Sequence, residues 1–294
     1  MKIMHLLPSL SSGGVEQVVL ELCQGLCARG EDCIVVSAGG SMVPLIEQAG
    51  ARHITRPIGR KSLNTLFQIR PLRRLLREEK PDILHLHSRV PAWVGYLAWR
   101  GMELGERPGL VTTFHGFHSV NAYSAVMAKG ERVIAVSRCM KEHILRHYPK
   151  TPAERIAVIP NSVDTEQNYP GYRPSEEWMR RWREQYPELE GQYTLCLPGR
   201  ITRIKGALRL VPILRELRSR GIPAHAVIVG ETKKGKEAFR REAEEAFASA
   251  GLSKAVTWTG HRRDLRDVLC ACDGTLPLTL QPESFAHTTL DALT

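Results

Sequence analysis

The stretch RVIAVSRCMKEHILRH, residues 132–147, contains the pattern that decides the fold. Four of its first five residues are apolar, and such a short run is typical of a buried strand. Ser137 then offers a side-chain oxygen that can cap a helix, and the helical pattern continues to His147. A buried strand followed directly by a capped helix is the building unit of a parallel sheet with helices on both faces.

The same alternation runs through the whole chain. Further strands are predicted at 2–7, 33–37, 83–87, 110–114, 156–159, 193–197, 224–229, 255–258 and 274–278. Helices are predicted at 15–29, 63–77, 176–186, 207–220, 236–250, 265–271 and from about Ser284 onward. The polar residues 165–175 predict a linker. We therefore expect an α/β chain with two Rossmann-like domains that face a cleft, at 1–164 and 176–294.

Composition excludes several other classes of protein. The chain has 294 residues, 43% of them hydrophobic, which is enough for two globular domains. No apolar run approaches the roughly 20 residues of a membrane-spanning helix, and the first residues do not have the pattern of a signal peptide. The seven cysteines include no C-x-x-C pair. Reduced thiols and a cytoplasmic location are therefore expected, rather than disulfides or a zinc site.

The formal net charge of +10 is concentrated in the first half, with basic residues densest between Arg60 and Lys80. A basic surface attracts nucleic acid, anionic lipid head groups or phosphorylated small molecules. The sequence has neither RNP-like aromatic residues nor zinc fingers, so no nucleic-acid partner is expected. Two alternatives stay open for the basic helix at 63–80: contact with an anionic membrane surface, or a solvated helix face.

Two candidate sites lie in the first half. Gly13 and Gly14 follow the first strand and open a helix, where backbone N–H groups can approach an anion, although such turns are also common without one. His115 follows the fourth strand and can hydrogen-bond a substrate or serve as an acid or base, or it can be structural. His85 and His87 alternate on a strand without a third ligand at a defined spacing, so core or cleft-lining roles are expected rather than a metal site.

The second half contains a pair of cations and a pair of acids. Arg200 and Lys205 flank a loop after a strand that ends at a glycine, an arrangement that suits a diphosphate or a solvated loop. Glu283 and Asp291 are eight residues apart across a loop and the helix after it. Both acids would lie on the same side of that helix, and they could hold hydroxyl groups at two ends of an extended ligand. An acid at a helix N-terminus can also simply stabilise the helix dipole.

Together these motifs resemble the retaining glycosyltransferases of family 4, which have the GT-B fold. The resemblance covers the whole chain, and the matching segments occur in the order typical of the family. These segments are 13–16 (GGVE), 81–87 (PDILHLH), 113–116 (TFHG), 136–137 (VS), 158–164 (VIPNSVD), 199–206 (GRITRIKG), 229–230 (VG) and 282–283 (PE).

The resemblance implies a role for each of the candidate residues. In the first domain, Gly13 and Gly14 would border the donor phosphates, and His115 would contact the transferred sugar. In the second domain, Arg200 and Lys205 would neutralise the diphosphate leaving group.

The two acids complete this assignment. Glu283 would hold hydroxyl groups of the donor sugar, and Asp291 would bind the ribose. Such enzymes need no metal or other cofactor, because cations and helix N-termini take its place. Asp291 stands where the family usually has glutamate, so its ribose contact is expected to be longer or bridged by water. The chain is also short for the family, which implies an incomplete second domain.

The resemblance also implies a function. We expect a transferase that moves a sugar from a nucleotide diphosphate sugar to a hydroxyl group of a saccharide or lipid-linked acceptor, with retention of anomeric configuration. The first domain would bind the acceptor and the second the donor. The expected setting is the synthesis of bacterial envelope polysaccharide or lipopolysaccharide, in the cytoplasm or peripherally on the inner face of the plasma membrane. Two alternatives remain: a GT-B nucleotide-sugar epimerase or hydrolase, and a truncated relic without catalytic activity.

Overall fold

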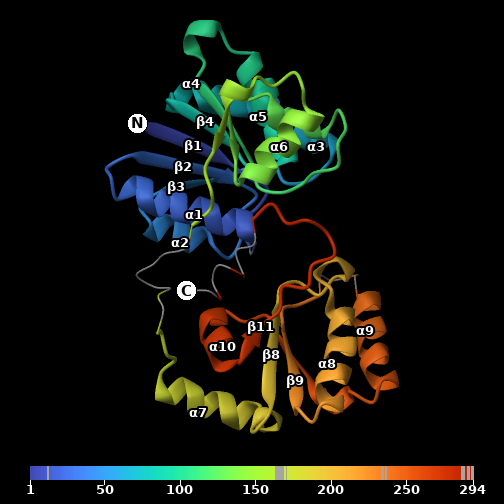
Figure 1. Cartoon of the computed structure of the whole chain (residues 1–294). Helices are drawn as coiled ribbons and strands as arrows, with labels where there is room; N and C mark the ends of the chain where they lie inside the picture. Colours follow the sequence, from blue (N-terminus) through green and yellow to red (C-terminus); the bar gives the residue numbers. More distant parts are fainter. Residues whose placement is uncertain are drawn as a thin grey trace. The chain divides into compact units, whose positions relative to one another are not determined.

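The computed structural model describes residues 1–11, 13–162, 169, 171–232, 235, 237–285, 289 and 292. The chain forms two compact units, Met1–Asn161 and Ser162–Thr294. In each unit, helices pack against a parallel β-sheet (Figure 1). This arrangement confirms the α/β fold class that the alternating strand and helix patterns predict.

The N-terminal unit contains a seven-stranded sheet in the order β3-β2-β1-β4-β5-β6-β7, and all of its strand pairs are parallel. The strands are β1 Lys2–Leu6, β2 Asp32–Ser37, β3 Arg52–Thr55, β4 Ile83–Leu86, β5 Gly109–Phe114, β6 Arg132–Ala135 and β7 Ile156–Val158. The α-helices are α1 Gly14–Cys27, α2 Val43–Gln48, α3 Leu63–Phe67, α4 Ile69–Glu79, α5 Arg89–Arg100 and α6 Arg138–His147. The hydroxyl of Ser137 caps α6 by accepting a hydrogen bond from the N–H of Met140 (3.2 Å), as the sequence predicts.

Side chains of each strand alternate between the two faces of this sheet. On β1, Met4 and Leu6 point into a core formed with α4, α5 and α6. Ile3 and Leu7 point to the opposite face, into a core formed with α1 and α2. Because His5 lies between Met4 and Leu6, its side chain is on the face of α1 and is buried there. The alternation therefore places a polar ring inside an otherwise apolar layer.

The C-terminal unit contains a four-stranded parallel sheet in the order β10-β9-β8-β11. Its strands are β8 Tyr193–Pro198, β9 Ala224–Val229, β10 Val256–Gly260 and β11 Gly274–Thr275. Its α-helices within the described residues are α7 Glu176–Gln185, α8 Leu210–Ser219, α9 Glu237–Ser249 and α10 Leu265–Ala271. Helices α8 and α9 pack on one face of this sheet, and α7 and α10 pack on the other.

Prolines account for three differences between the predicted and the observed elements. The helix predicted at 63–77 is divided into α3 and α4, because Pro71 has no N–H to donate to the carbonyl four residues earlier. Pro212 likewise delays α8, so residues Ala207–Arg209 form a separate 3-10 turn, η6. The strand predicted at 274–278 is only Gly274–Thr275, since its last backbone bond runs from the N–H of Leu276 to Cys196 and Pro277 cannot continue the ladder.

Among the described residues, no helix is both long enough and apolar enough to cross a lipid bilayer.

Candidate functional site

Two of the predicted site residues in the C-terminal unit lie side by side. Lys205 is the last residue of the short 3-10 helix η5 (Arg203–Lys205), which follows β8. Its ammonium group donates a hydrogen bond to a carboxylate oxygen of Glu283 and forms an ion pair with it. Both side chains remain partly exposed, at 31% for Lys205 and 23% for Glu283. A cation and an acid 78 residues apart in sequence are thus held together at the solvent boundary.

Gly206 holds the loop that carries Lys205 close to the segment that leads to Glu283. Its φ of 77° lies in the left-handed region, and a Cβ atom at this position would lie 2.0 Å from the carbonyl oxygen of Leu278. Two residues further on, the N–H of Leu280 donates to the carbonyl of Ile204 (2.7 Å). These backbone contacts position Glu283 against Lys205.

The other two predicted residues of this unit are not part of that pair. Arg200 is exposed on the loop after β8 and forms no ion pair within the described part of the chain. Asp291 lies outside the described residues. Glu283 itself is in a non-helical segment, and residues 286–288 lie outside the described residues, so its place at a helix N-terminus stays a prediction.

In the N-terminal unit, Gly13 and Gly14 lie at the start of α1, as predicted, and Gly13 is its N-cap. The carboxylate of Glu16 folds back over this turn: a Cβ atom on Gly13 would be 2.5 Å from one of its oxygens. The positive end of the helix is therefore already faced by an anionic side chain, which favours the helix in the absence of any ligand. A phosphate group at this turn would have to displace Glu16.

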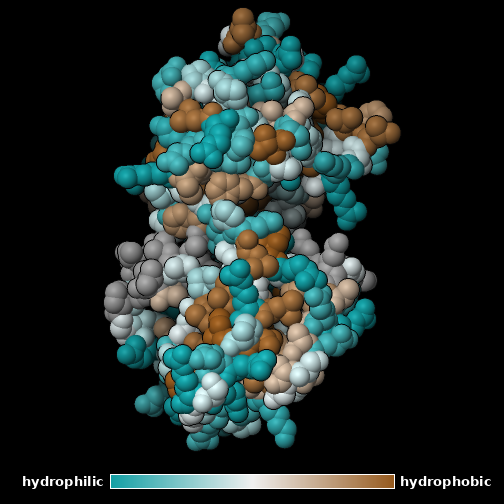
Figure 2. Space-filling view, turned by 45° about the vertical axis from the view of Figure 1, so that its right-hand side comes forward, coloured by the Kyte–Doolittle hydropathy of each residue, from teal (hydrophilic) through white to brown (hydrophobic). Residues whose placement is uncertain are grey.

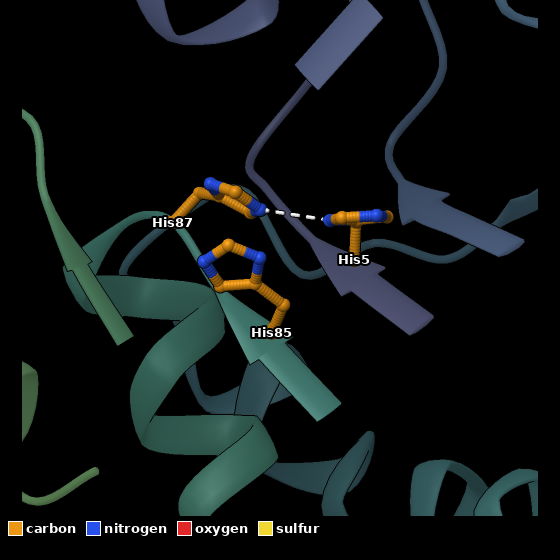
Figure 3. Close-up of side chains that lie close together, drawn as sticks. All are labelled: His5, His85 and His87. Carbon is orange, nitrogen blue, oxygen red and sulfur yellow. Dashed lines mark hydrogen bonds between the residues drawn. The ribbon is translucent and has the colours of Figure 1, made fainter. Parts of the chain in front are cut away.

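His115 lies directly after β5 and is half-buried. Its Nε2 is hydrogen-bonded to Nδ1 of His87 (3.0 Å), and Nε2 of His87 is hydrogen-bonded to Nδ1 of His5 (3.0 Å; Figure 3). His5 comes from the neighbouring strand β1, and His87 follows β4. A row of three imidazoles therefore runs from the predicted functional histidine into the core.

Burial keeps His87, and His85 beside it, in the uncharged form. His85 lies next to His87 on the same sheet face, with ring centroids 4.0 Å apart, and its Nε2 is hydrogen-bonded to the hydroxyl of Thr113 (2.7 Å). Burial, followed by repulsion from the neighbouring imidazoles, holds the pKa values of His85 and His87 well below the usual range of histidine. Both rings are therefore neutral at physiological pH.

Neutral imidazoles can bind metal ions, and ring nitrogens of His5, His85 and His87 lie within 4.8 Å of one another. However, the nitrogens that face each other between His5 and His87 already share a hydrogen bond, and Nε2 of His85 is engaged with Thr113. The arrangement therefore fits a hydrogen-bonded histidine core better than a metal-binding site. It agrees with the core or cleft-lining roles expected for His85 and His87.

His5 was not among the site residues predicted from the sequence. Its relation to His85 depends on the pairing of β1 with β4, which places the two residues directly opposite each other. Strands 1 and 4 are separated by more than 70 residues, and nothing in the local pattern indicates that they are neighbours. The available signal was weak: a histidine inside an apolar strand must have a buried hydrogen-bond partner.

Two models of known protein families match this chain. Residues 12–167 match the model of "Glycosyltransferase Family 4". The chain belongs to this family. Residues 192–294 match a second model, "Glycosyl transferases group 1". The segments that contain Gly13, His115, Lys205 and Glu283 all fall within these two matches.

Individual members of the family show how far the likeness extends. An alpha-maltose-1-phosphate synthase of Mycolicibacterium smegmatis is 31% identical over 134 residues, which are 45% of this chain and 30% of that protein. A crystal structure of a glycosyltransferase from Rickettsia africae ESF-5 has a TM-score of 0.84 and 26% identity, and it covers 99% of this chain and 76% of that one.

A third relative, Anabaena Alr3699/HepE in complex with UDP-glucose, has a TM-score of 0.82 and 21% identity, with coverage of 100% of this chain and 78% of that one. This likeness shows a shared GT-B fold. The chain is shorter than each of these proteins, and its matched part spans 30% and 51% of the length of two curated relatives.

Proposed function

We propose that this protein transfers a sugar from a nucleotide diphosphate sugar to a hydroxyl group of an acceptor, with retention of anomeric configuration. The observation that carries the proposal is the pairing of Lys205 with Glu283 in a chain of glycosyltransferase family 4. A bound nucleotide diphosphate sugar presents an anionic diphosphate beside neutral hydroxyl groups. A cation next to a carboxylate provides a partner for each of these groups.

In the proposed reaction, the bond between the sugar and the diphosphate breaks, and negative charge grows on the departing phosphate oxygen. Lys205 and Arg200 offset this charge, while Glu283 holds hydroxyl groups of the sugar and Asp291 holds the ribose. His115 contacts the transferred sugar. The acceptor hydroxyl attacks from the face on which the diphosphate leaves, which retains the configuration. Catalysis then consists of positioning and of electrostatic stabilisation, and it requires neither a protein nucleophile nor a metal ion.

Product analysis tests this proposal. The protein is incubated with UDP-glucose, the donor bound by the Anabaena relative, and with other UDP, GDP and ADP sugars, together with saccharide and lipid-linked acceptors. The expected product is an acceptor glycoside with the anomeric configuration of the donor, as measured by NMR. Sugar release that does not depend on any acceptor would instead indicate an epimerase or hydrolase. Absence of a thermal shift with UDP, GDP and ADP would indicate a non-catalytic relic.

We also propose that the N-terminal unit binds the acceptor and contacts an anionic membrane surface, as suits an enzyme that glycosylates envelope lipids. Three large apolar side chains of the α3 segment are exposed: Leu63 at 76%, Leu66 at 50% and Phe67 at 73%. Apolar side chains stand out on the surface of this unit in Figure 2. Exposed cations lie close by in sequence, at Arg60, Lys61, Arg70 and Arg74. Apolar anchors beside basic residues are typical of proteins that bind the cytoplasmic leaflet.

The double substitution Leu63→Ser and Phe67→Ser is expected to lower binding to vesicles that contain anionic phosphatidylglycerol by about tenfold or more, since each apolar anchor contributes roughly 1–2 kcal/mol. Vesicle co-sedimentation measures this change. Leu45→Ser removes a partly exposed aliphatic side chain from α2 and should leave binding unchanged. Equal binding by the double variant and the unmodified protein would refute the membrane contact.

A further inference from the structure

The row of imidazoles connects His115 to the interior through two buried rings. His87 and His5 are each only 1% exposed, and the two hydrogen bonds that link the three rings are both 3.0 Å long. Figure 3 shows the ring of His5 directed at His87, with His85 packed beside them. Both buried rings are thus held in place by their neighbours and face defined partners.

The neutral ring of His87 has only one N–H group for its two hydrogen bonds. Because burial keeps the pKa of His87 far below neutral pH, its ring has one N–H group and one bare nitrogen. Both of its nitrogens face another imidazole, so His87 donates to one neighbour and accepts from the other. The two hydrogen bonds must therefore run in the same direction along the row.

The buried end of the row, at His5, indicates in which direction the two hydrogen bonds run. Nε2 of His5 is buried and has no hydrogen-bond partner among the described residues. Buried N–H groups are rarely left unpaired, whereas a bare acceptor is tolerated more often. Nε2 is therefore the bare nitrogen, and His5 carries its proton on Nδ1. It follows that His5 donates to His87, and that Nδ1 of His87 donates to Nε2 of His115.

We propose that His5 and His87 are positioning residues that hold His115 in the tautomer with its proton on Nδ1. Since Nε2 of His115 accepts from His87, Nδ1 is the nitrogen that carries the hydrogen. If the proposed function holds, on which the catalytic consequence rests, His115 meets the transferred sugar as a hydrogen-bond donor in a fixed orientation. A histidine without this row would have to select its tautomer and ring orientation during each catalytic cycle.

Two thiols that lie beyond His5 could reverse the direction of both hydrogen bonds in the row. The sulfur atoms of Cys23 and Cys33 lie within 4.8 Å of each other and of a ring nitrogen of His5. A hydrogen bond with the Cys23 thiol is the main cause that lowers the pKa of Cys33 to about 5, against the effect of burial, and polar contact with the side chain of His5 lowers it further. A thiolate at Cys33 would be stabilised chiefly by the neighbouring Cys23 thiol. If Nε2 of His5 carried a proton directed at this thiolate, both hydrogen bonds of the row would run in the opposite direction.

Long-range 1H–15N NMR on protein labelled in its histidine rings tests the proposal directly, because protonated and bare ring nitrogens give distinct signals. The His115 resonances are assigned by their loss in His115→Gln. In the unmodified protein, His115 is expected as a single species with its proton on Nδ1. A proton on Nε2 would overturn the proposal, and its return to Nδ1 in Cys33→Ala would identify the thiol as the group that reversed the row.

Variants of His5 test the influence of the row on His115. His5→Leu should release His115 into a mixture of tautomers, whereas His5→Asn, whose amide nitrogen can take the place of Nδ1, should keep the single species. His225→Leu removes an equally buried strand histidine, hydrogen-bonded to Thr257 in the other unit, and serves as the control. An unchanged spectrum in His5→Leu would also overturn the proposal. The spectrum of the unmodified protein decides the direction even if the leucine variant does not fold.

The kinetic consequence is measured separately. His5→Leu should lower kcat by about tenfold with little change in KM for the donor, and His5→Asn should stay within about twofold of the unmodified protein. A general loss of packing would instead affect both variants and lower stability in parallel. Because the NMR measurement needs no turnover, failure to find transferase activity would refute the proposed function without affecting the proposed tautomer.

Discussion

Lys205→Ala is expected to lower kcat/KM for the nucleotide sugar by about 10²- to 10³-fold, the effect typical of removing one preorganised group that stabilises developing charge. The loss has two causes in the proposed reaction. The diphosphate loses a cation, and the carboxylate of Glu283 loses the partner with which Lys205 forms an ion pair. The remaining negative charge of Glu283 would then repel the diphosphate. Steady-state kinetics with the donor found in the product analysis measure the effect.

Arg203→Ala is the matched control for this experiment. Arg203 belongs to the same short helix as Lys205, but its side chain is 62% exposed and forms an ion pair with Glu242. Its removal should change kcat/KM by less than about twofold, since exposed ion pairs contribute little. Similar losses in both variants would indicate a general effect of the loop's charge, and full activity of Lys205→Ala would exclude Lys205 from the site.

Gly206→Ala is expected to have the largest effect on stability, a loss of about 3 kcal/mol or more in the free energy of unfolding. The added Cβ atom would lie 2.0 Å from the carbonyl oxygen of Leu278, and the φ of 77° is unfavourable for alanine. Relief of this clash requires the segment that leads to Glu283 to move away from the Lys205 loop. Urea denaturation should therefore show a lower midpoint, and donor binding should be lost as well.

Gly221→Ala separates the cost of the backbone conformation from the cost of the steric clash with Leu278. Gly221 has nearly the same φ, 79°, but a Cβ atom there would have no neighbour within 4 Å. This variant should lose only about 1 kcal/mol and retain donor binding. Equal destabilisation by the two substitutions would mean that the close approach of Leu278 contributes nothing.

Local patterns in the sequence were sufficient to predict most of the elements. The apolar run 132–136 and the capping residue Ser137 correctly predict β6 and α6. Strand β3, Arg52–Thr55, was missed because Ile54 is the one apolar residue among its four positions, so it does not form an apolar run. Helix α5, Arg89–Arg100, was not singled out either. A short strand such as β3 depends on packing against its neighbours more than on its own composition.

The candidate site was predictable only in part, for a physical reason. The sequence identified Lys205 and Glu283 one by one, but their pairing depends on a contact across 78 residues that the backbone around Gly206 creates. His5 was missed because strand order and register determine which side chains meet on a sheet face, and neither can be derived from local periodicity. The sequence therefore indicated the chemical groups, and the topology determined which of them come together.

The ion pair between Lys205 and Glu283 also changes how donor affinity should respond to ionic strength. A bare cluster of cations attracts a diphosphate over long distances, and dissolved salt weakens that attraction steeply. Here the ammonium group of Lys205 already has the Glu283 carboxylate as its counter-ion. In the proposed reaction, the diphosphate of the incoming nucleotide therefore replaces this carboxylate as the partner of Lys205. Selectivity among anions would then depend on how well a ligand also accommodates the displaced carboxylate. Sugar hydroxyl groups can donate hydrogen bonds to the carboxylate without adding charge, whereas inorganic phosphate places further negative charge beside it.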